Sequence, residues 1–220
     1  MLEIKGAIFD LDGTLVDSMY AWETVGSDYL KSIGKVPEEG FDEKIMAMSI
    51  ADSIEYMRTN YGVVGTDEEV VAGLNNMIGH LYKTEIKTKP GIKAILDFME
   101  KKGIAKTVAT ANDRQMVEDT LEHNNISKYF KSIYTCNEVK KGKEFPDIYE
   151  IAMADLGTDK DSTVVFEDGI HAMRTCAKHD FRIIGMVEDN NKIHIEEMKE
   201  ICEFLVKNEE DLLDLIKEQA

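Results

Sequence analysis

Short apolar runs that each stop at a polar side chain are the feature that most constrains how this chain can fold. The runs occupy residues 7–9, 107–109, 163–166 and 183–187, with a weaker run at 132–135. Runs of this length are typical of strands that are buried on both faces. Helical patterns separate them, and this alternation predicts an α/β fold with a doubly wound parallel sheet and helices on both of its faces.

Several helices between these runs have recognisable beginnings. Proline or a capping aspartate stands where they are expected to start, at Pro90, Asp113 and Pro146, and a further helix is expected over 170–179. The tail is expected to form a short helix at 194–200, an edge strand at 202–206 and a last helix near 209–217.

The region from about residue 18 to residue 86 differs, because it has helical patterns and no convincing strand. Three helices are expected there, one with apolar residues from Trp22 to Ile33, one from Ile50 to Met57, and one that begins at a capping box of Thr66 and Glu69. We therefore expect a helical cap domain at 17–85, inserted into a Rossmann-like core made of 1–16 and 86–220. A small lobe of this kind can close over a site.

Composition narrows the classes of partner. With 26 Lys and Arg against 43 Asp and Glu, the 220 residues have a formal net charge of −17, and such a surface repels nucleic acid and anionic membranes. The apolar runs are too short to span a bilayer. Cys136, Cys176 and Cys202 lie far apart and form no Cys-x-x-Cys pair, which favours reduced thiols in a cytoplasmic protein.

Polar groups with complementary chemistry follow the predicted strands. They are Asp10 and Asp12 after the first strand, Thr110, Ala111 and Asn112 after the second, Glu167 and Asp168 after a later one, and Lys143 in the loop before the Pro146 helix. A doubly wound sheet has its ligand crevice outside the carboxyl ends of the strands. Four carboxylates meeting there would repel one another unless a hard cation neutralised them. Oxygen ligands without clustered His or Cys favour Mg²⁺ over zinc.

Each of these groups also has a purely structural interpretation. Asp10–Thr14 fits a turn with a helix cap, and Thr110 fits a strand-end hydroxyl. Lys143 fits a solvated lysine-rich loop, and Glu167–Asp168 fit the cap of the next helix. Their joint occurrence at successive strand ends, in this order, favours a functional site.

Four segments of the chain resemble signatures of the haloacid dehalogenase superfamily, in the branch that has an α-helical cap. They are Phe9–Ser18 with the pattern Asp-Leu-Asp-Gly-Thr, Val108–Asn112, Lys143–Asp147 and Val165–Asp168. The resemblance covers essentially the whole chain. It implies a Rossmann-like catalytic core with an inserted helical cap.

The resemblance implies a chemical role for each matching residue. Asp10 would be the nucleophile that forms an aspartyl-phosphate, and Asp12 the general acid for the leaving alcohol and then the base for water. The phosphoryl group would be bound by Thr110 and Lys143, with Ala111 and Asn112 beside them. Mg²⁺ would be held by Asp10, the main-chain carbonyl of Asp12, and Asp168, with Glu167 next to it.

The activity that the resemblance implies is hydrolysis of a small phosphorylated metabolite, a sugar or polyol monophosphate, with Mg²⁺. An aspartate at position 12 favours this chemistry. In the same signature the dehalogenases have the pattern Asp-x-Tyr and the phosphonate hydrolases have the pattern Asp-x-Ala, so neither has an aspartate at this position. A phosphomutase of the β-phosphoglucomutase type and a non-catalytic sensor of a phosphorylated ligand remain as alternatives. Monomer and dimer both remain open.

Three apolar residues of the cap bear on the choice between hydrolase and mutase. Trp22, Met46 and Ile50 stand where the mutase has cap groups that hold a second phosphate. An apolar set cannot hold that charge well, so we expect these side chains to face the organic part of a monophosphate. The structural alternative is that they belong to the core of the cap.

Overall fold

The computed structural model describes residues 4–46 and 48–219, with side chains described as far as residue 215. The chain forms two compact units, Met1–Asp17 with Lys87–Ala220, which we call the core unit, and Ser18–Ile86, which we call the cap unit. The predicted limits of the cap, 17–85, lie one residue from the limits of the second unit.

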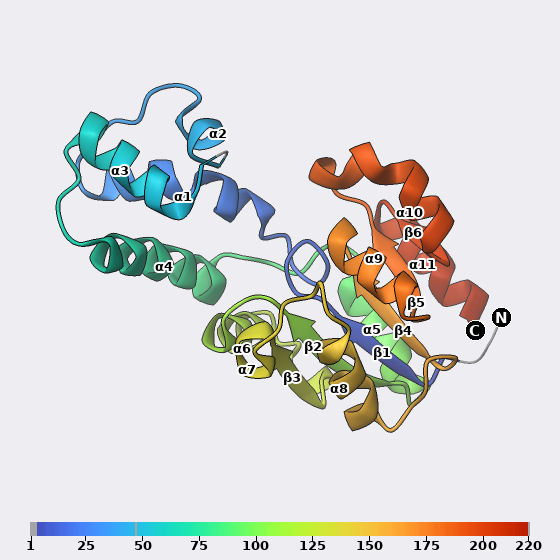
Figure 1. Ribbon diagram of the computed structural model, residues 1–220. Helices are drawn as coiled ribbons and strands as arrows, with labels where there is room; N and C mark the ends of the chain where they lie inside the picture. Colours follow the sequence, from blue (N-terminus) through green and yellow to red (C-terminus); the bar gives the residue numbers. More distant parts are fainter. Residues whose placement is uncertain (1–3, 47, 220) are drawn as a thin grey trace. The chain divides into compact units, whose positions relative to one another are not determined.

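The core unit contains a parallel sheet of six strands in the order β3-β2-β1-β4-β5-β6 (Figure 1). The strands are β1 (Gly6–Phe9), β2 (Ala105–Thr110), β3 (Ser132–Thr135), β4 (Thr163–Glu167), β5 (Arg182–Met186) and β6 (Phe204–Val206). The predicted α/β fold with a parallel sheet is confirmed. The chain order reverses between β1 and β4, where a doubly wound sheet opens its crevice.

Complete burial explains why the strands read as continuous apolar runs. In the central strand β1, Ala7, Ile8 and Phe9 are fully buried. The ring of Phe9 stacks on Phe166 of the neighbouring strand, with ring centroids 4.3 Å apart. Strands covered on both faces need apolar side chains pointing both ways.

Helices cover both faces of this sheet. On one face α8 (Asp147–Leu156), α9 (Ile170–Lys178) and α10 (Ile195–Ile201) share one apolar core. On the other, α5 (Ile92–Lys101) packs against α11 (Glu209–Gln219). The remaining helical elements of the core unit are α6 (Arg114–His123), α7 (Cys136–Val139) and the 3₁₀ helices η1 (Ser127–Tyr129) and η2 (Asp189–His194).

The cap unit consists of helices around a small core of its own. They are α1 (Met19–Ser32), α2 (Phe41–Met46), α3 (Ile50–Tyr61) and α4 (Asp67–Thr84). The predicted capping box is present, since Thr66 and Glu69 satisfy each other's backbone N–H groups at the start of α4. Helix α2 was not predicted, because it has only six residues.

The exposed fractions of Met46 and Ile50 show whether these side chains belong to the core of the cap. Met46 is 61% exposed and Ile50 is 69% exposed, so the interpretation of these two as cap-core residues is wrong. The apolar spacing of α3 reaches the core only at Ile54 and Met57, which are buried.

No helix in the described part of the chain is long and apolar enough to cross a membrane.

Candidate active site

The turn after β1 brings Asp10 and Asp12 to the carboxyl end of the sheet. The backbone N–H of Asp10 donates to the carbonyl oxygen of Phe166 at 2.9 Å, which continues the pairing of β1 with β4. Gly13 turns the chain with a φ of +71°, in a region that glycine adopts readily. A methyl group at this position would lie 2.3 Å from Asp168 Oδ2. The turn therefore requires glycine if Asp168 is to approach it.

Three carboxylates meet at this edge of the sheet. One oxygen atom from each of Asp10, Glu167 and Asp168 lies within 4.8 Å of the others, and all three residues are buried. The strand register explains the meeting, because Phe9 is paired with Phe166 and the next residue of each strand is an acid. We call these three residues the carboxylate cluster.

Lys143 lies between two members of the carboxylate cluster. Its Nζ is 2.5 Å from Asp10 Oδ1 and 2.8 Å from Glu167 Oε2, and its side chain is only 13% exposed. Lys141, on the same loop, instead pairs with Asp147 at the surface. The loop thus directs Lys143 toward the interior and Lys141 toward the solvent.

Glu167 has a further partner that no motif in the sequence indicated. The hydroxyl of Tyr149 in α8 donates to Glu167 Oε2 at 3.1 Å, and Tyr149 is fully buried. The backbone N–H of Gly169 donates to the other carboxylate oxygen at 3.1 Å. A buried tyrosine needs a partner for its hydroxyl, and a tyrosine in the helix that follows Lys143 was the only signal of this contact.

Negative charge exceeds positive charge in this buried region. Burial and the charge of Asp10 raise the pKa of Glu167 to about 7, even though Lys143 acts in the opposite direction. Burial, Asp10 and Glu167 raise the pKa of Asp168 to about 8. Burial disfavours the ammonium of Lys143, but the two adjacent carboxylates outweigh it and raise its pKa. The carboxylate cluster is therefore suited to a divalent cation.

A second polar group stands at the end of β2. Asn112 Nδ2 donates to Asp12 Oδ2 at 2.9 Å, and the backbone N–H of Asn112 donates to Thr110 Oγ1 at 3.0 Å. Thr110 and Asn112 are buried, whereas Ala111 between them is exposed. The predicted residues after the first and second strands are thus linked to each other.

The three predicted cap residues belong to α1, α2 and α3 of the cap unit. Trp22 is 39% exposed, and its Nε1 donates to the hydroxyl of Tyr82, a fully buried residue of α4, at 2.8 Å. This bond fixes the orientation of the indole ring. The side chains of Met46 and Ile50 are more exposed than that of Trp22.

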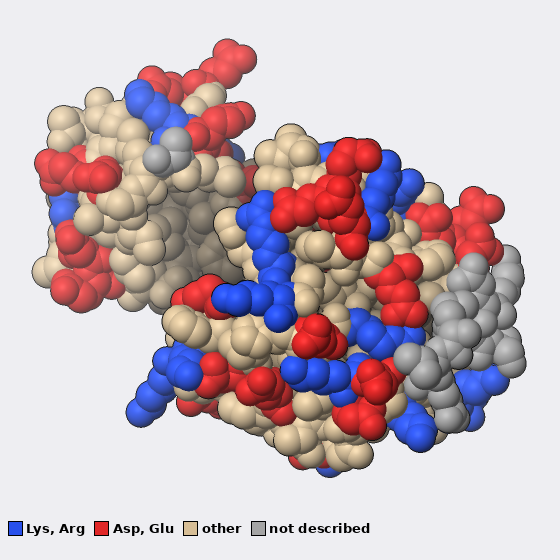
Figure 2. All heavy atoms as spheres, turned by 45° about the vertical axis from the view of Figure 1, so that its right-hand side comes forward, with Lys and Arg blue, Asp and Glu red and all other residues tan. Residues whose placement is uncertain are grey.

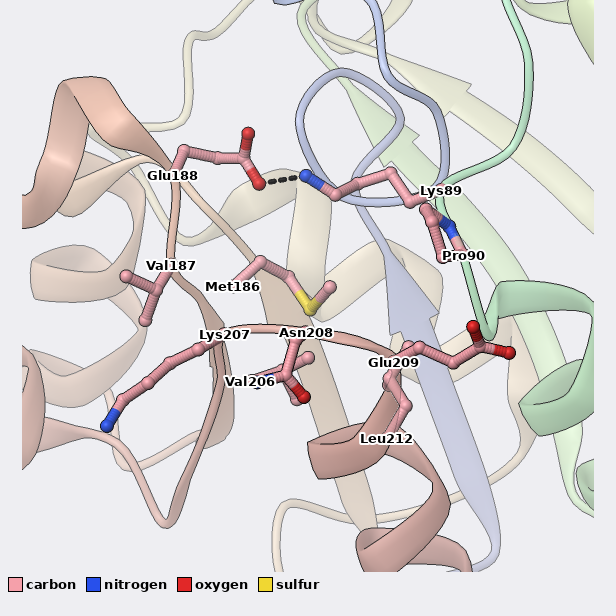
Figure 3. Close-up of a pocket in the computed structure, with 10 residues that line it drawn as sticks. All are labelled: Lys89, Pro90, Met186, Val187, Glu188, Val206, Lys207, Asn208, Glu209 and Leu212. Carbon is pink, nitrogen blue, oxygen red and sulfur yellow. Dashed lines mark hydrogen bonds and ion pairs between the residues drawn. The ribbon is translucent and has the colours of Figure 1, made fainter.

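A pocket of about 250 Å³ lies elsewhere in the core unit (Figure 3). Met186, Val206 and Leu212 form an apolar wall at the ends of β5 and β6, and an ion pair between Lys89 and Glu188 crosses one side. Among the described residues that line it, none belongs to the carboxylate cluster. The acidic chemistry is therefore located outside this pocket.

A family model that covers most of the chain identifies the family of this protein. Residues 7–186 match the family model for haloacid dehalogenase-like hydrolases. The chain belongs to this family. The match confirms the resemblance of the sequence to the haloacid dehalogenase superfamily.

Two curated relatives of this haloacid dehalogenase-like hydrolase are named as phosphatases. The phosphorylated carbohydrates phosphatase of Thermotoga maritima is 26% identical over 191 residues, which cover 86% of this chain and 88% of the relative. Hexitol phosphatase A of Escherichia coli is 30% identical over 171 residues, or 76% of each protein. The fold is similar to that of a solved Thermotoga maritima protein with the provisional name β-phosphoglucomutase, with a TM-score of 0.86 and 24% identity over 99% of this chain and 100% of that one.

Proposed function

We propose that the chain is a Mg²⁺-dependent phosphatase that hydrolyses a small sugar or polyol monophosphate through an aspartyl-phosphate at Asp10. The observation that carries the proposal is the buried carboxylate cluster with Lys143 bound between Asp10 and Glu167. The names of the relatives, a phosphorylated carbohydrates phosphatase and a hexitol phosphatase, support the substrate class.

Asp10 and Asp12 divide the chemistry between them. In the first step an oxygen of Asp10 attacks phosphorus, the bond from phosphorus to the alcohol oxygen breaks, and Asp12 gives that oxygen a proton. In the second step Asp12 takes a proton from water, the water oxygen attacks phosphorus, and the bond to Asp10 breaks. The hydrogen bond from Asn112 orients Asp12 for both transfers. Thr110 and Lys143 bind the phosphoryl oxygens and offset their charge.

The carboxylate cluster fits a hard divalent cation. Asp10, Glu167 and Asp168 offer oxygen ligands, the ligand type that Mg²⁺ prefers, and the main-chain carbonyl of Asp12 is a further ligand in our proposal. Bound Mg²⁺ supplies positive charge that stabilises the phosphoryl group in the transition state.

A strongly acidic protein needs local positive charge to bind a phosphate ester. The net charge is −17, and Figure 2 shows acidic side chains spread among Lys and Arg over one face of the molecule. Lys143 and the cation reverse the sign of this field where the phosphoryl group binds. The rest of the surface selects against large polyanions.

The proposal is tested by measuring inorganic phosphate released from a panel of hexose, hexitol, pentitol and glycerol monophosphates, ranked by kcat/KM. We expect turnover with Mg²⁺, none in EDTA, and recovery when Mg²⁺ is restored. Interconversion of hexose 1- and 6-phosphates with little phosphate release would establish a mutase instead. Stoichiometric binding without turnover across the panel would establish a sensor.

We expect Mg²⁺ to raise the Tm more strongly as the pH increases. The unfolded chain ionises Glu167 and Asp168 near pH 4, but the metal-free fold retains their protons up to about pH 7 and 8, so these groups reduce its stability progressively between about pH 4 and 8. Mg²⁺ binds the ionised form and offsets this loss. At a Mg²⁺ concentration a hundredfold above its Kd, the gain in the free energy of unfolding is about 3 kcal/mol. Thermal unfolding at about pH 6 and pH 8.5 checks this, with NaCl of equal ionic strength as the control. An equal increase in Tm at both pH values would contradict it.

Trp22 is expected to contribute to binding of the organic part of the substrate. Trp22→Ala should lower kcat/KM about 5- to 30-fold, mainly through KM, because the lost apolar contact is worth about 1–2 kcal/mol. Tyr20→Ala is the matched control, since Tyr20 is a similarly exposed aromatic residue of the same helix. Steady-state kinetics on the best substrate should leave Tyr20→Ala within about twofold of the wild type. Equal effects of the two substitutions would refute a specific role for Trp22.

A further inference from the structure

Asn191 connects the end of β4 to the end of β5. Its side chain is 5% exposed, and its Nδ2 donates to the main-chain carbonyl oxygens of Asp168 at 2.8 Å and Met186 at 2.9 Å. Its Oδ1 accepts from the backbone N–H of Glu188 at 2.9 Å. Both amide hydrogens are therefore used, in a residue that is nearly inaccessible to water.

The strand register explains why an amide is needed at this place. The described pairing between β4 and β5 ends with Glu167 opposite Gly185, so Asp168 and Met186 are the next residues along the two strands. Their carbonyl oxygens both accept hydrogen bonds and cannot pair with each other. Asn191 donates one hydrogen bond to each carbonyl oxygen. The connection between the two strands is thereby extended to Asp168, the member of the carboxylate cluster that directly follows β4.

The carboxylate of Asp168 depends on this backbone support more than its neighbour does. Glu167 is held through its side chain by Lys143 and Tyr149. Among the described residues, no hydrogen-bond or ion-pair partner of the Asp168 carboxylate is found. The position of that carboxylate is therefore set by the backbone of residue 168, and the side chain that holds this backbone is Asn191.

We propose that Asn191 is a positioning residue for the metal site: it fixes the main chain of Asp168 and thereby holds the Asp168 carboxylate in place to bind Mg²⁺. The inference rests on the proposed function, because it takes the carboxylate cluster as the Mg²⁺ site. Hydrogen-bond partners of metal ligands typically contribute about 10- to 100-fold to metal affinity. Met186 and Glu188, the other two contacts of Asn191, line the pocket of Figure 3, so Asn191 joins the wall of that pocket to the carboxylate cluster.

Calorimetric titration of the substrate-free protein with Mg²⁺ tests the inference. We expect Asn191→Ala to raise the Kd for Mg²⁺ about 10-fold or more, and turnover to recover when Mg²⁺ is increased accordingly. The matched control is Asn124→Ala. Asn124 also accepts a backbone hydrogen bond, from Thr88, and donates to a carbonyl oxygen, that of Thr120. Both variants should lower the Tm by roughly 5 °C, but the control should leave the Kd within about twofold.

Asn191→Asp provides a second variant if Asn191→Ala fails to fold. It keeps the acceptor for Glu188 and replaces the two donors with a carboxylate, whose added negative charge by itself would attract Mg²⁺ more strongly. Weaker binding by this variant would therefore support the positioning role. Binding within about twofold of the wild type, or tighter, would overturn it while leaving the proposed function intact. A wild-type protein that binds no Mg²⁺ would overturn both.

Discussion

Replacing Asp10 by asparagine is expected to abolish phosphate release, with kcat at least about 10⁴-fold below that of the wild type. Asparagine keeps the shape of the side chain and an oxygen that can accept from Lys143 Nζ, the atom now 2.5 Å from Asp10 Oδ1. A neutral amide oxygen is a poor nucleophile and forms no aspartyl-phosphate. Hydrolysis of p-nitrophenyl phosphate with Mg²⁺ measures the loss. The control Asp17→Asn changes an exposed aspartate of the same segment and should stay within about twofold of the wild type.

The same substitution is expected to make the metal-free protein more stable. Burial raises the pKa of Glu167 and of Asp168, and the charge of Asp10 raises both further. Without that charge the two groups ionise at lower pH, so less stability is lost between about pH 4 and 8. Urea unfolding in EDTA near pH 8 should show a gain of about 1 kcal/mol. Loss of activity together with loss of stability would point to a damaged fold, and retained turnover would exclude Asp10 as the nucleophile.

Much of the core unit was predictable because buried parallel strands and capped helices leave local patterns in a sequence. The apolar runs identified β1 to β5, and β6 lies within the edge strand expected at 202–206. Asp113 accepts the expected cap hydrogen bond, from the backbone N–H of Gln115. The four-residue helix α7 was missed, because it is too short for a periodic apolar face. In the cap unit the spacing of α3 predicted the helix, yet spacing alone does not show that Ile50 stands beyond the end of the packed core.

The acids of the candidate site were predictable for a different reason. Residues that directly follow parallel strands must appear at the same edge of the sheet, so Asp10 and Glu167 were expected to meet. The contacts of Tyr149 and Asn191 were not predictable in this way, because each depends on how a helix packs over a strand end distant in sequence. Neither residue carries a local pattern that distinguishes a buried hydrogen bond from an ordinary surface position.

Replacing Lys143 by methionine is expected to lower kcat about 10²- to 10³-fold, because one preorganised positive donor to the phosphoryl group is lost. It should also destabilise the metal-free protein near pH 8 by about 3 kcal/mol, because two buried carboxylates lose their counter-charge. Lys143 lowers the pKa of both Glu167 and Asp168, so without it these groups keep their protons to higher pH. The stability loss should therefore be smaller near pH 6, where both groups are protonated.

Lys141→Met separates this effect from a general effect of removing a lysine. Lys141 belongs to the same loop but pairs at the surface with Asp147, a contact worth little in water. We expect its activity to remain within about twofold of the wild type and its unfolding curve to shift by less than about 1 kcal/mol. Metal-free Asp10→Asn and Lys143→Met should shift stability in opposite directions, because one removes negative charge from the cluster and the other removes positive charge. If Lys141→Met matched Lys143→Met in kinetics and stability, the catalytic lysine would have been assigned wrongly.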